Sequence, residues 1–451
     1  MDADVVIAGA GIAGISTAYH LTSLGAERVV VCDPLAPLTL TSDKSTECYR
    51  NWWPGPDDTM VSFMNRSIDL LEEWSDASND IFNLSRRGYL YLTADESELE
   101  RMADQAREIS ALGAGELRMH DSDASRYMPS VPHGWRDAPG GADLFMTGQA
   151  LRSAFPYVSD SVVGGLHARR AGWVSAQQLG MWLLEVARDR GAELVQASVT
   201  DVAVTDGEVT AVTLSNGRRI STSRFIDAAG PLIEQVAGLV GVQLPVHHEV
   251  HRKISFRDSL GAVPRDAPML IWNDAQELAW TEEERELLAS DPTLSPLMGC
   301  LSAGAHCRPD GPADGAIVLG LWEYRTDVRT PTFPIPEDPM YPELVMRGLA
   351  TMLPAVGEYL DHLPQPYVDG GYYTKTSENR PLIGPVGPSG SFVVGALSGY
   401  GVMAAPASGE LVARQALGLE LPDYSGFLSL DRYSDVDYRR VLDLMEDQGQ
   451  L

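Results

Sequence analysis

Lysine is nearly absent from this chain of 451 residues. Three lysines occur, Lys44, Lys253 and Lys375, and the 34 basic residues are outnumbered by 63 acidic ones, so the formal net charge is −29. A surface of this charge repels phosphodiester backbones and anionic membranes, so we expect neither nucleic acid nor a membrane as a partner. An anionic substrate would need a local group of arginines to attract it.

Cysteine is also scarce. Four cysteines occur, without a CxxC pair, which argues against a disulfide scaffold in a chain of this length. Cys300 and Cys307 flank His306, but this spacing does not match a common metal-ligand pattern. No apolar run reaches membrane-spanning length, and the N-terminus has neither the basic region nor the cleavage site of a signal peptide. We therefore expect a cytoplasmic protein, whose oligomeric state the sequence leaves open.

A nucleotide-binding fingerprint occupies the N-terminal region. The pattern predicts an apolar strand over 4–8, a helix over 12–24 and a second strand over 28–32. The turn between the first strand and the helix has the spacing GxGxxG, and an acidic residue closes the second strand (Gly9, Gly11, Gly14 and Asp33). Strand, helix and acid in register favour a dinucleotide site over a glycine turn in an unrelated βαβ unit.

Each part of the fingerprint has a physical role in such a site. Gly9 permits the tight turn, Gly11 lets a pyrophosphate approach the backbone, and Gly14 lets the helix pack on the sheet. The amides of Ile12 and Ala13, at the N-terminus of the helix, face the phosphates. The acidic residue accepts hydrogen bonds from ribose hydroxyls. The sequence therefore predicts a bound dinucleotide, either NAD or FAD.

A β-meander lies further along the chain and favours FAD. Alternating apolar runs over 199–230 are separated by Asp-Gly and Asn-Gly dipeptides at 206–207 and 216–217, both strong hairpin signals. A plain nicotinamide dehydrogenase has no need of this meander. The stretch 392–418 predicts a strand, a glycine turn and a helix, which would fold the C-terminal region back against a long ligand.

Four segments resemble a known family. They are the fingerprint at 5–33, RFIDAAGP at 224–231, YYTKTSENRPLIGP at 372–385 and GALSGYGVMAAPASGE at 395–410. In this order they resemble the D-amino-acid oxidase superfamily of flavoproteins, and within it the branch of glycine oxidase, monomeric sarcosine oxidase and dimethylglycine dehydrogenase. The resemblance spans nearly the whole chain and is weakest over 129–172 and in the substrate region.

The resemblance implies an α/β fold. It consists of a Rossmann-like FAD-binding domain with a β-meander, plus an antiparallel-sheet substrate domain. Chain length and composition, with 44% hydrophobic and 22% charged residues, are consistent with two globular domains. We expect the FAD-binding domain to comprise residues 1–88, 173–244 and 369–451, and the substrate domain to comprise 89–172 and 245–368.

The resemblance also implies which residues hold FAD. The segment 41–54 would run beneath the flavin ring, where small hydroxyls bond the phosphates and the ring edge. Backbone amides around Tyr400 would stabilise negative charge at the pyrimidine end of the ring. The expected FAD contacts are Gly9, Gly11, Ile12, Ala13, Gly14, Asp33, Ser42, Lys44, Ser45, Thr46, Cys48, Val199, Gly230, Gly371, Arg380, Gly399, Gly401, Val402 and Met403.

The mode of FAD attachment has two interpretations. Cys48 aligns with the position at which dimethylglycine dehydrogenase attaches its flavin through histidine, so a covalent cysteinyl link is one of them. An inert buried thiol is the other. A second attachment position known in this branch holds a cysteine where this chain has Gly371, so that linkage is absent. We expect non-covalent FAD.

Four residues are expected to act on the substrate: Arg50, Lys253, Tyr400 and His251. By resemblance Arg50 lies over the flavin, where a cation favours the anionic reduced ring or holds a substrate carboxylate; the alternative is an ion pair between domains. Lys253 would promote electron transfer to O2, or else be an exposed lysine. Tyr400 would line the substrate pocket, or else be an aromatic residue at a strand end. His251 would remove the ammonium proton, or else be structural.

These features together predict FAD-dependent oxidation of a C–N bond. The substrate would be an amino acid or a secondary or N-methyl amine, the hydride would pass to flavin N5, and an imine would form. The acceptor, O2 or an electron-transfer partner, stays open. The alternatives are a FAD-dependent 2-hydroxy-acid dehydrogenase and the flavin subunit of a heteromeric dehydrogenase complex. Trp52, Trp53 and Trp272, in expected pocket regions, favour a substrate larger or more apolar than glycine.

Overall fold

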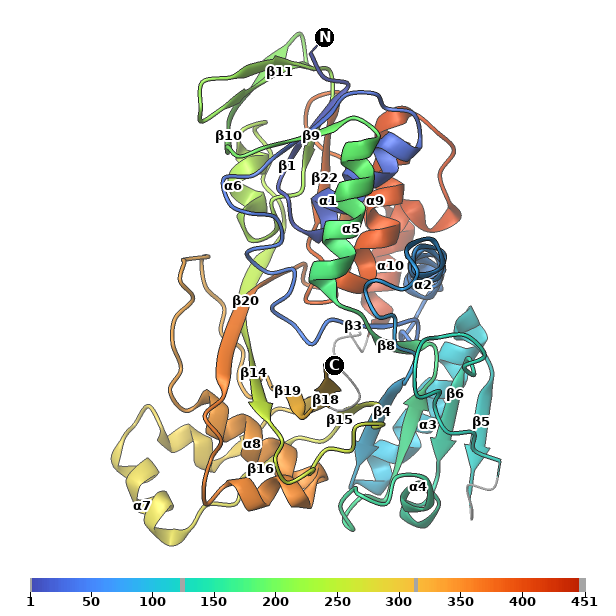
Figure 1. Ribbon diagram of the computed structural model, residues 1–451, viewed down its shortest axis with the longest axis vertical. Coiled ribbons are helices and arrows are strands. Elements are labelled where there is room, and N and C mark those ends of the chain that lie inside the picture. The colour runs from blue at the N-terminus through green and yellow to red at the C-terminus, as the bar shows by residue number, and fades with distance from the viewer. Residues whose placement is uncertain (1, 122–125, 312–314, 446–451) are drawn as a thin grey trace.

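Two large sheets organise the chain. The computed structural model describes residues 2–121, 126–311 and 315–445. One sheet has six strands and the other has nine, and they form the upper and lower halves of the molecule in Figure 1. Within the described ranges, no helix combines the length and the apolar character needed to cross a bilayer.

The six-stranded sheet carries the N-terminal fingerprint. Its order is β21 (Leu382–Pro385), β22 (Ser391–Gly395), β13 (Phe225–Asp227), β1 (Val5–Ala8), β2 (Val29–Cys32) and β9 (Ala192–Val195). All neighbouring pairs are parallel except β21 with β22. The strands β1, β2 and β13 are buried along their whole length, as expected for a parallel sheet covered on both faces.

Helices cover one face of this sheet, and the predicted meander covers the other. The helices are α1 (Ile12–Ser23), α5 (Ala176–Asp189) and α9 (Gly401–Leu417), and the meander is β10 (Val199–Thr205), β11 (Glu208–Leu214) and β12 (Arg219–Ser221). Side chains alternate between the two faces of β1. Val5 and Ile7 pack with the helices, whereas Val6 and Ala8 pack with the meander. The prediction of a three-stranded meander is therefore confirmed.

The nine-stranded sheet is mostly antiparallel. Its order is β20 (Tyr367–Lys375), β14 (His247–Arg257), β19 (Ile317–Leu321), β18 (His306–Asp310), β15 (Met269–Trp272), β4 (Tyr89–Thr93), β7 (Gly164–Ala168), β6 (Ala142–Phe145) and β5 (Leu117–His120). Two of its pairs, β4 with β15 and β5 with β6, are parallel. The region 129–172, where the family resemblance is weakest, supplies β6, β7 and the helix α4 (Gly148–Ala154).

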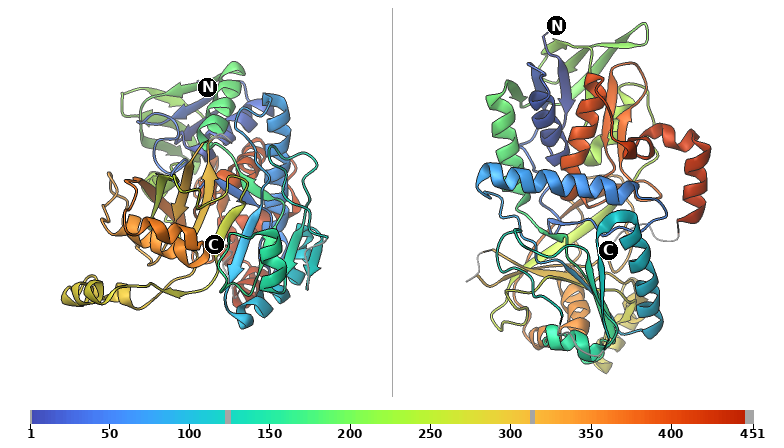
Figure 2. Two further views of the ribbon diagram at one scale, coloured as in Figure 1. Left: turned by 60° about the horizontal axis from the view of Figure 1, so that its bottom comes forward. Right: turned by 90° about the vertical axis from the view of Figure 1, so that its right-hand side faces the viewer.

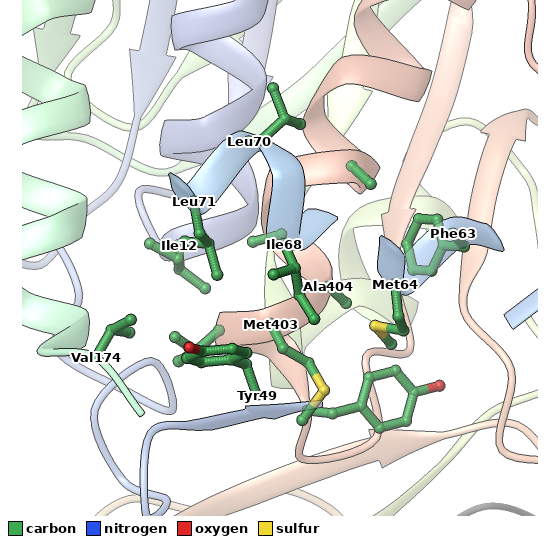
Figure 3. Close-up of a cluster of buried hydrophobic side chains, with 14 of the residues drawn as sticks. Ile12, Tyr49, Phe63, Met64, Ile68, Leu70, Leu71, Val174, Met403 and Ala404 are labelled. Carbon is green, nitrogen blue, oxygen red and sulfur yellow. The ribbon is translucent and has the colours of Figure 1, made fainter. Parts of the chain in front are cut away.

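Helix α2 (Thr59–Ser78) runs between the two halves, as the right-hand view of Figure 2 shows. Its apolar residues recur at helical spacing and are all buried: Met60, Phe63, Met64, Ile68, Leu71 and Trp74. Met64, Ile68 and Leu71 point toward Met403 and Tyr49 in Figure 3, so this face packs on the start of α9 and on β3 (Cys48–Arg50). The helix thereby fixes two segments that contribute to the site.

The remaining elements complete the two halves. Helix α7 (Glu282–Ser290) extends away from the body in the left-hand view of Figure 2 and begins with a capping box between Thr281 and Glu284. The others are α3 (Glu96–Ile109), α6 (Ile233–Gly238), α8 (Tyr341–Met352), α10 (Val436–Leu444), β8 (Ala171–Trp173), β16 (Gln276–Glu277) and β17 (Cys300–Leu301). We propose that the two sheets mark two domains with the ranges expected from the sequence, and that β20 connects them.

Candidate active site

The turn between β1 and α1 has no room for side chains. Gly9 has a φ of +110°, and a Cβ placed on it would lie 2.3 Å from the carbonyl oxygen of Ala228. A Cβ on Gly14 would lie 2.0 Å from the carbonyl oxygen of Gly9. Both residues must therefore be glycine for the turn to pack against the end of β13.

A carboxylate and a helix N-terminus lie beside this turn. Asp33 follows β2, and its two oxygens accept hydrogen bonds from the backbone N–H groups of Ala10 and Leu35, each at 2.8 Å. The N–H of Ile12, in the first turn of α1, donates to the hydroxyl of Ser42 at 3.0 Å. A carboxylate in this position suits ribose hydroxyls, and a helix N-terminus in this position suits phosphates.

A cleft that is open to solvent runs along these groups, with an empty volume of about 890 Å³. Of the expected FAD contacts, the structure brings eleven to its lining: Gly9, Gly11, Ile12, Ala13, Asp33, Ser42, Ser45, Gly230, Gly399, Gly401 and Val402. A dinucleotide fits this set of groups, because the cleft joins an acidic residue, a helix N-terminus and a side-chain-free turn.

A second cavity, of about 670 Å³, opens from one end of the cleft. The two share Ser45, Tyr373, Ser398 and Gly399, so a ligand group at this end of the cleft would form a wall of the cavity. Gly399 has a φ of +83°, and a Cβ on it would lie 2.2 Å from the ring of Tyr373. Three more expected FAD contacts line this cavity instead of the cleft: Thr46, Cys48 and Met403.

Arg50 is a buried cation in the second cavity. Its Nε donates to the carbonyl oxygen of Trp52 at 3.1 Å. Its guanidinium lies 4.7 Å from the ring centre of Trp53 and 5.7 Å from that of Tyr89. Aromatic faces attract a cation and keep water from it, so a substrate anion here would meet a poorly hydrated guanidinium.

His306 is a neutral hydrogen-bond acceptor in the same cavity. Burial lowers the pKa of His306 to about 4, so the ring is neutral at neutral pH. Nδ1 lies 2.7 Å from the carbonyl oxygen of Gly304, which can only accept, so the proton is on Nδ1. Nε2 therefore carries a lone pair, and in the described part of the chain no hydrogen bond reaches it.

His251 and Glu323 also line this cavity. Nδ1 of His251 lies 3.1 Å from Glu323 Oε1, and Nε2 lies 3.1 Å from Glu249 Oε2. The ring stacks on Tyr373, with centroids 3.9 Å apart and an interplanar angle of 18°. Burial alone lowers the pKa of His251, but the carboxylates of Glu323 and Glu249 outweigh it and raise the pKa above its ordinary value.

Tyr400 contributes an aromatic wall. Its hydroxyl donates to the carbonyl oxygen of Asn379 at 2.5 Å, and its ring meets Trp53 edge-on with centroids 4.9 Å apart. Burial raises the pKa of Tyr400, so the phenol keeps its proton. Of the three tryptophans considered from the sequence, Trp53 lines the cavity, whereas Trp52 and Trp272 are buried in the core.

The structure places Lys253 behind the segment 43–46 and not at either cavity. Its Nζ donates to the carbonyl oxygens of Asp43 and Ser45, the latter at 3.1 Å. Arg308 donates from Nε to the next carbonyl, that of Thr46, at 2.6 Å. Two cations of the nine-stranded sheet, Lys253 and Arg308, thus fix the segment 43–46, which contributes to the linings of the cleft and of the second cavity.

Cys48 faces the second cavity as a thiol. Its Sγ donates to the carbonyl oxygen of Thr46 at 3.2 Å and lies 3.6 Å from Sδ of Met269. Burial raises the pKa of Cys48, which opposes formation of the thiolate.

The other expected contacts lie away from the linings described. Lys44 forms an ion pair with Asp369 at 2.8 Å, and the buried Arg380 pairs with Asp57 at 2.8 Å. Gly14 and Gly371 lie behind the cleft, where a Cβ on Gly371 would be 3.3 Å from Thr41. Val199 begins β10, in the meander.

Sequence reasoning missed Glu323, Tyr373 and Glu249. The signal that could have found Glu249 is the alternation His-x-Glu-x-His-x-Lys over 247–253, since alternate residues of a strand share a face. Glu323 follows β19 and Tyr373 is on β20, more than 40 residues apart by their numbers, and the sequence has no local pattern that joins them.

The chain belongs to the DAO family of FAD dependent oxidoreductases, whose sequence model matches residues 4–415. It is therefore a FAD-dependent enzyme, and we propose that the cleft is its FAD site. No curated protein sequence matches the chain.

Solved structures share its fold. L-proline dehydrogenase from P. horikoshii is 18% identical with a TM-score of 0.73, over 96% of this chain and 98% of that one. Glycine oxidase from Geobacillus kaustophilus is 16% identical with a TM-score of 0.71, over 95% and 98%. Iminodiacetate oxidase from a Chelativorans species is 19% identical with a TM-score of 0.69, over 94% and 98%. At these identities the likeness concerns the fold.

Proposed function

We propose that this enzyme oxidises the C–N bond of an amino acid or of a secondary or N-methyl amine, giving an imine. The observation that carries the proposal is the second cavity, which opens at one end of the FAD cleft and holds a cation, Arg50, together with a carboxylate, Glu323. This pair complements the opposite charges of an amino acid. The structures with the same fold that are named for proline, glycine and iminodiacetate support the same substrate class.

The residues of the cavity have distinct roles in this proposal. Arg50 holds the substrate carboxylate, and its aromatic surroundings strengthen that ion pair by excluding water. His306 accepts an N–H of the amine on Nε2 and so orients the nitrogen, while its low pKa prevents it from storing a proton. Trp53 and Tyr400 supply apolar area for a side chain or N-substituent.

FAD supplies the hydride acceptor, flavin N5, when it is bound. The segment 43–46, fixed by Lys253 and Arg308, would support the ring, and Tyr373 and Gly399 would border its end. We propose that attachment is non-covalent, because burial keeps Cys48 as a thiol and a thiol is a poor nucleophile. Denaturation of the yellow protein should release all of its flavin into solution.

A substrate panel tests the proposal. Purified holoenzyme is mixed without oxygen with amino acids, N-methyl amines and 2-hydroxy acids, and bleaching of the flavin absorbance is recorded. We expect bleaching by members of the first two groups. Readmission of air, with measurement of peroxide, then distinguishes an oxidase from a dehydrogenase. Bleaching by 2-hydroxy acids alone would contradict the proposal.

A further inference from the structure

A row of titratable side chains leads from the second cavity to the protein surface. His247, Glu249 and His251 are alternate residues of β14 and therefore share one face of the strand. Lys253 is the next residue of the same face. On the neighbouring strand β20, Lys375 is the register partner of His247, and Tyr373 is the partner of Glu249.

The row that concerns us runs from Glu323 through His251 and Glu249 to His247, and the nearest polar atoms of successive side chains are 3.1 Å apart. Oε1 of Glu323 lies at this distance from Nδ1 of His251 as an ion-pair contact without hydrogen-bond geometry, and Nε2 of His251 is hydrogen-bonded at this distance to Oε2 of Glu249. Oε1 of Glu249 and Nε2 of His247 are hydrogen-bonded at 3.1 Å. Side-chain exposure is 25% at Glu323, 3% at His251, 13% at Glu249 and 38% at His247, so the two middle members are the most buried and the row reaches solvent at His247.

Neighbouring side chains hold the row in place. Lys375 donates to Oε2 of Glu249 at 2.5 Å, and the ring of Tyr373 covers the ring of His251. These contacts fix the orientation of the carboxylate and of the imidazole. A fixed geometry matters here because proton transfer requires each donor and acceptor to stay within hydrogen-bond distance.

The cavity needs an outlet for a proton. An amine reaches the enzyme mainly as an ammonium ion at neutral pH, and hydride can leave its carbon only after the nitrogen has lost a proton. Burial raises the pKa of the thiol and phenols that line the cavity, so they keep their protons: Cys48, Tyr89, Tyr373 and Tyr400. His306, with a pKa of about 4, is too weak a base. Glu323 and His251 remain.

We propose that Glu323, His251, Glu249 and His247 form a proton relay that carries the substrate's ammonium proton from the cavity to solvent. The inference rests on the proposed function, because an amine is the source of the proton. Beyond the proposed function, the relay assigns Glu323 as the base that takes the substrate's proton and His247 as the residue that releases a proton to solvent.

The steps balance as proton transfers. An N–H bond of the substrate breaks and an O–H bond forms on Glu323, which leaves the amine neutral. Glu323 then protonates Nδ1 of a neutral His251, whose Nε2 proton passes to Glu249. After a half-turn of its carboxyl group, Glu249 hands this proton to Nε2 of a neutral His247, and solvent removes one proton from the resulting imidazolium. Proton exchange with solvent, one proton gained on Nε2 and one lost from Nδ1, returns His251 to its starting tautomer. One proton enters at the substrate and one leaves at the surface, without a change in oxidation state.

The charges around His251 suit its part in the relay. The carboxylates of Glu323 and Glu249 stabilise the imidazolium form, and Lys375 partly offsets them. His306 on β18, Lys253 on β14 and Asp369 on β20 also carry titratable groups on these strands, and Lys253 is committed to the carbonyl oxygens of Asp43 and Ser45. The bonds from His251 and Lys375 outweigh burial and lower the pKa of Glu249 to about 2, so this carboxylate releases a proton quickly.

Substitution of Glu249 by glutamine tests the relay. Glu249→Gln should slow flavin reduction by an amine about tenfold to a hundredfold below the pKa of the free amine. At a pH above that value the substrate arrives without its extra proton, so the rate should return to that of the wild type. Anaerobic stopped-flow measurement across pH, in H2O and D2O, records both effects, and the solvent isotope effect should rise in the variant.

A matched control exists on the opposite face of the same strand. Oε2 of Glu234 lies 3.0 Å from Nε2 of His248. His248 is on the face of β14 opposite to His247 and His251, so Glu234 pairs with His248 as Glu249 pairs with His251. Glu234→Gln should keep the wild-type pH profile. A loss equal to that of Glu249→Gln would overturn the relay and indicate a general effect of a lost carboxylate at β14.

Two further measurements separate a relay from a structural role. His247→Gln should be slowed at low pH and rescued by millimolar imidazole, which replaces the lost side chain at the surface. In NMR titrations of the histidine rings, the His251 signal, assigned through His251→Asn, should titrate at a lower pH in Glu249→Gln than in the wild type. Unchanged profiles and an unchanged His251 titration would overturn the relay while amine oxidation stands. If no amine bleaches the flavin, the proposed function fails instead.

Discussion

The guanidinium of Arg50 lies 4.7 Å from the ring centre of Trp53, and the edge of Tyr400 packs on the same indole. The cation of the second cavity is therefore held against an aromatic wall that continues to the SGYG turn at the start of α9. In the proposed function, this arrangement would tie the position of the substrate carboxylate to the position of the flavin.

Replacement of Arg50 should affect acidic substrates selectively. Arg50→Met is expected to raise the KM for an amino acid by about a hundredfold, because a desolvated charge-assisted pair contributes about 2–3 kcal/mol. The KM for an amine without a carboxylate should change much less. Steady-state kinetics on such a substrate pair measure the difference. Arg325→Met, which removes an exposed arginine paired with Asp338 at 3.1 Å, is the control. Equal losses for both substrates would exclude a carboxylate contact.

Gly14 should be essential for FAD binding. Gly14→Ala would place a methyl group 2.0 Å from the carbonyl oxygen of Gly9, so the β1–α1 turn must shift away from the phosphates. We expect the Kd for FAD to rise by at least about a hundredfold, a cost of about 3 kcal/mol. Titration of the apoprotein with FAD, followed by flavin fluorescence, measures this. Gly238→Ala adds a methyl group in open space and should bind FAD normally. Tight binding by Gly14→Ala would show that phosphates do not use this turn.

Lys253 should stabilise the protein and position the cofactor. Lys253→Met removes the donor to two carbonyl oxygens of the segment beneath the proposed ring, and should cost about 1–3 kcal/mol in the free energy of unfolding. FAD affinity should fall as well. Lys44→Met breaks a partly exposed ion pair and should cost less than about 1 kcal/mol. Urea unfolding of both variants gives the comparison. If Lys253→Met instead left stability unchanged and slowed only the reaction with O2, the lysine would act on the flavin.

Stability should decline on mild acidification because several histidines are buried in the neutral form. Burial lowers the pKa of His20 to about 4 and that of His167 to about 3, whereas in the unfolded chain both titrate near 6.5. The unfolded state therefore binds more protons below pH 6.5, and stability falls as the pH drops from 6.5 toward 4. At pH 5 each histidine should cost about 2 kcal/mol. Thermal melting between pH 7 and 5 tests this, and His167→Gln should flatten the dependence. A pH-independent Tm would contradict it.

Local sequence pattern was sufficient for the βαβ unit that lines the proposed FAD site. Gly9, Gly14 and Asp33 are identifiable because each meets a requirement of the local structure. Gly9 has a positive φ, Gly14 allows a close backbone contact, and Asp33 places a carboxylate at a strand end. The buried face of α2 is identifiable because its apolar residues recur at helical spacing. In both cases the physical constraint acts within one or two adjacent elements.

The substrate cavity could not be derived in the same way. His306 is on β18, Glu323 follows β19 and Tyr373 is on β20, and strand pairing over long sequence separations brings them together. Lys253 shows the converse. The sequence suggested that it acts in electron transfer to O2, which stays a prediction, and its hydrogen bonds to backbone carbonyls cannot be inferred from its position on a strand.

The most direct test of the central claim compares two substrates with the same carbon skeleton, an amino acid that the panel identifies and its 2-hydroxy acid analogue. Anaerobic flavin reduction is followed by stopped flow, with the α-carbon carrying hydrogen or deuterium. We predict that the amino acid reduces the flavin and shows a primary isotope effect, and that the hydroxy acid does not reduce it. Reduction by the hydroxy acid with an inert amino acid would contradict oxidation of a C–N bond in the Arg50–Glu323 cavity.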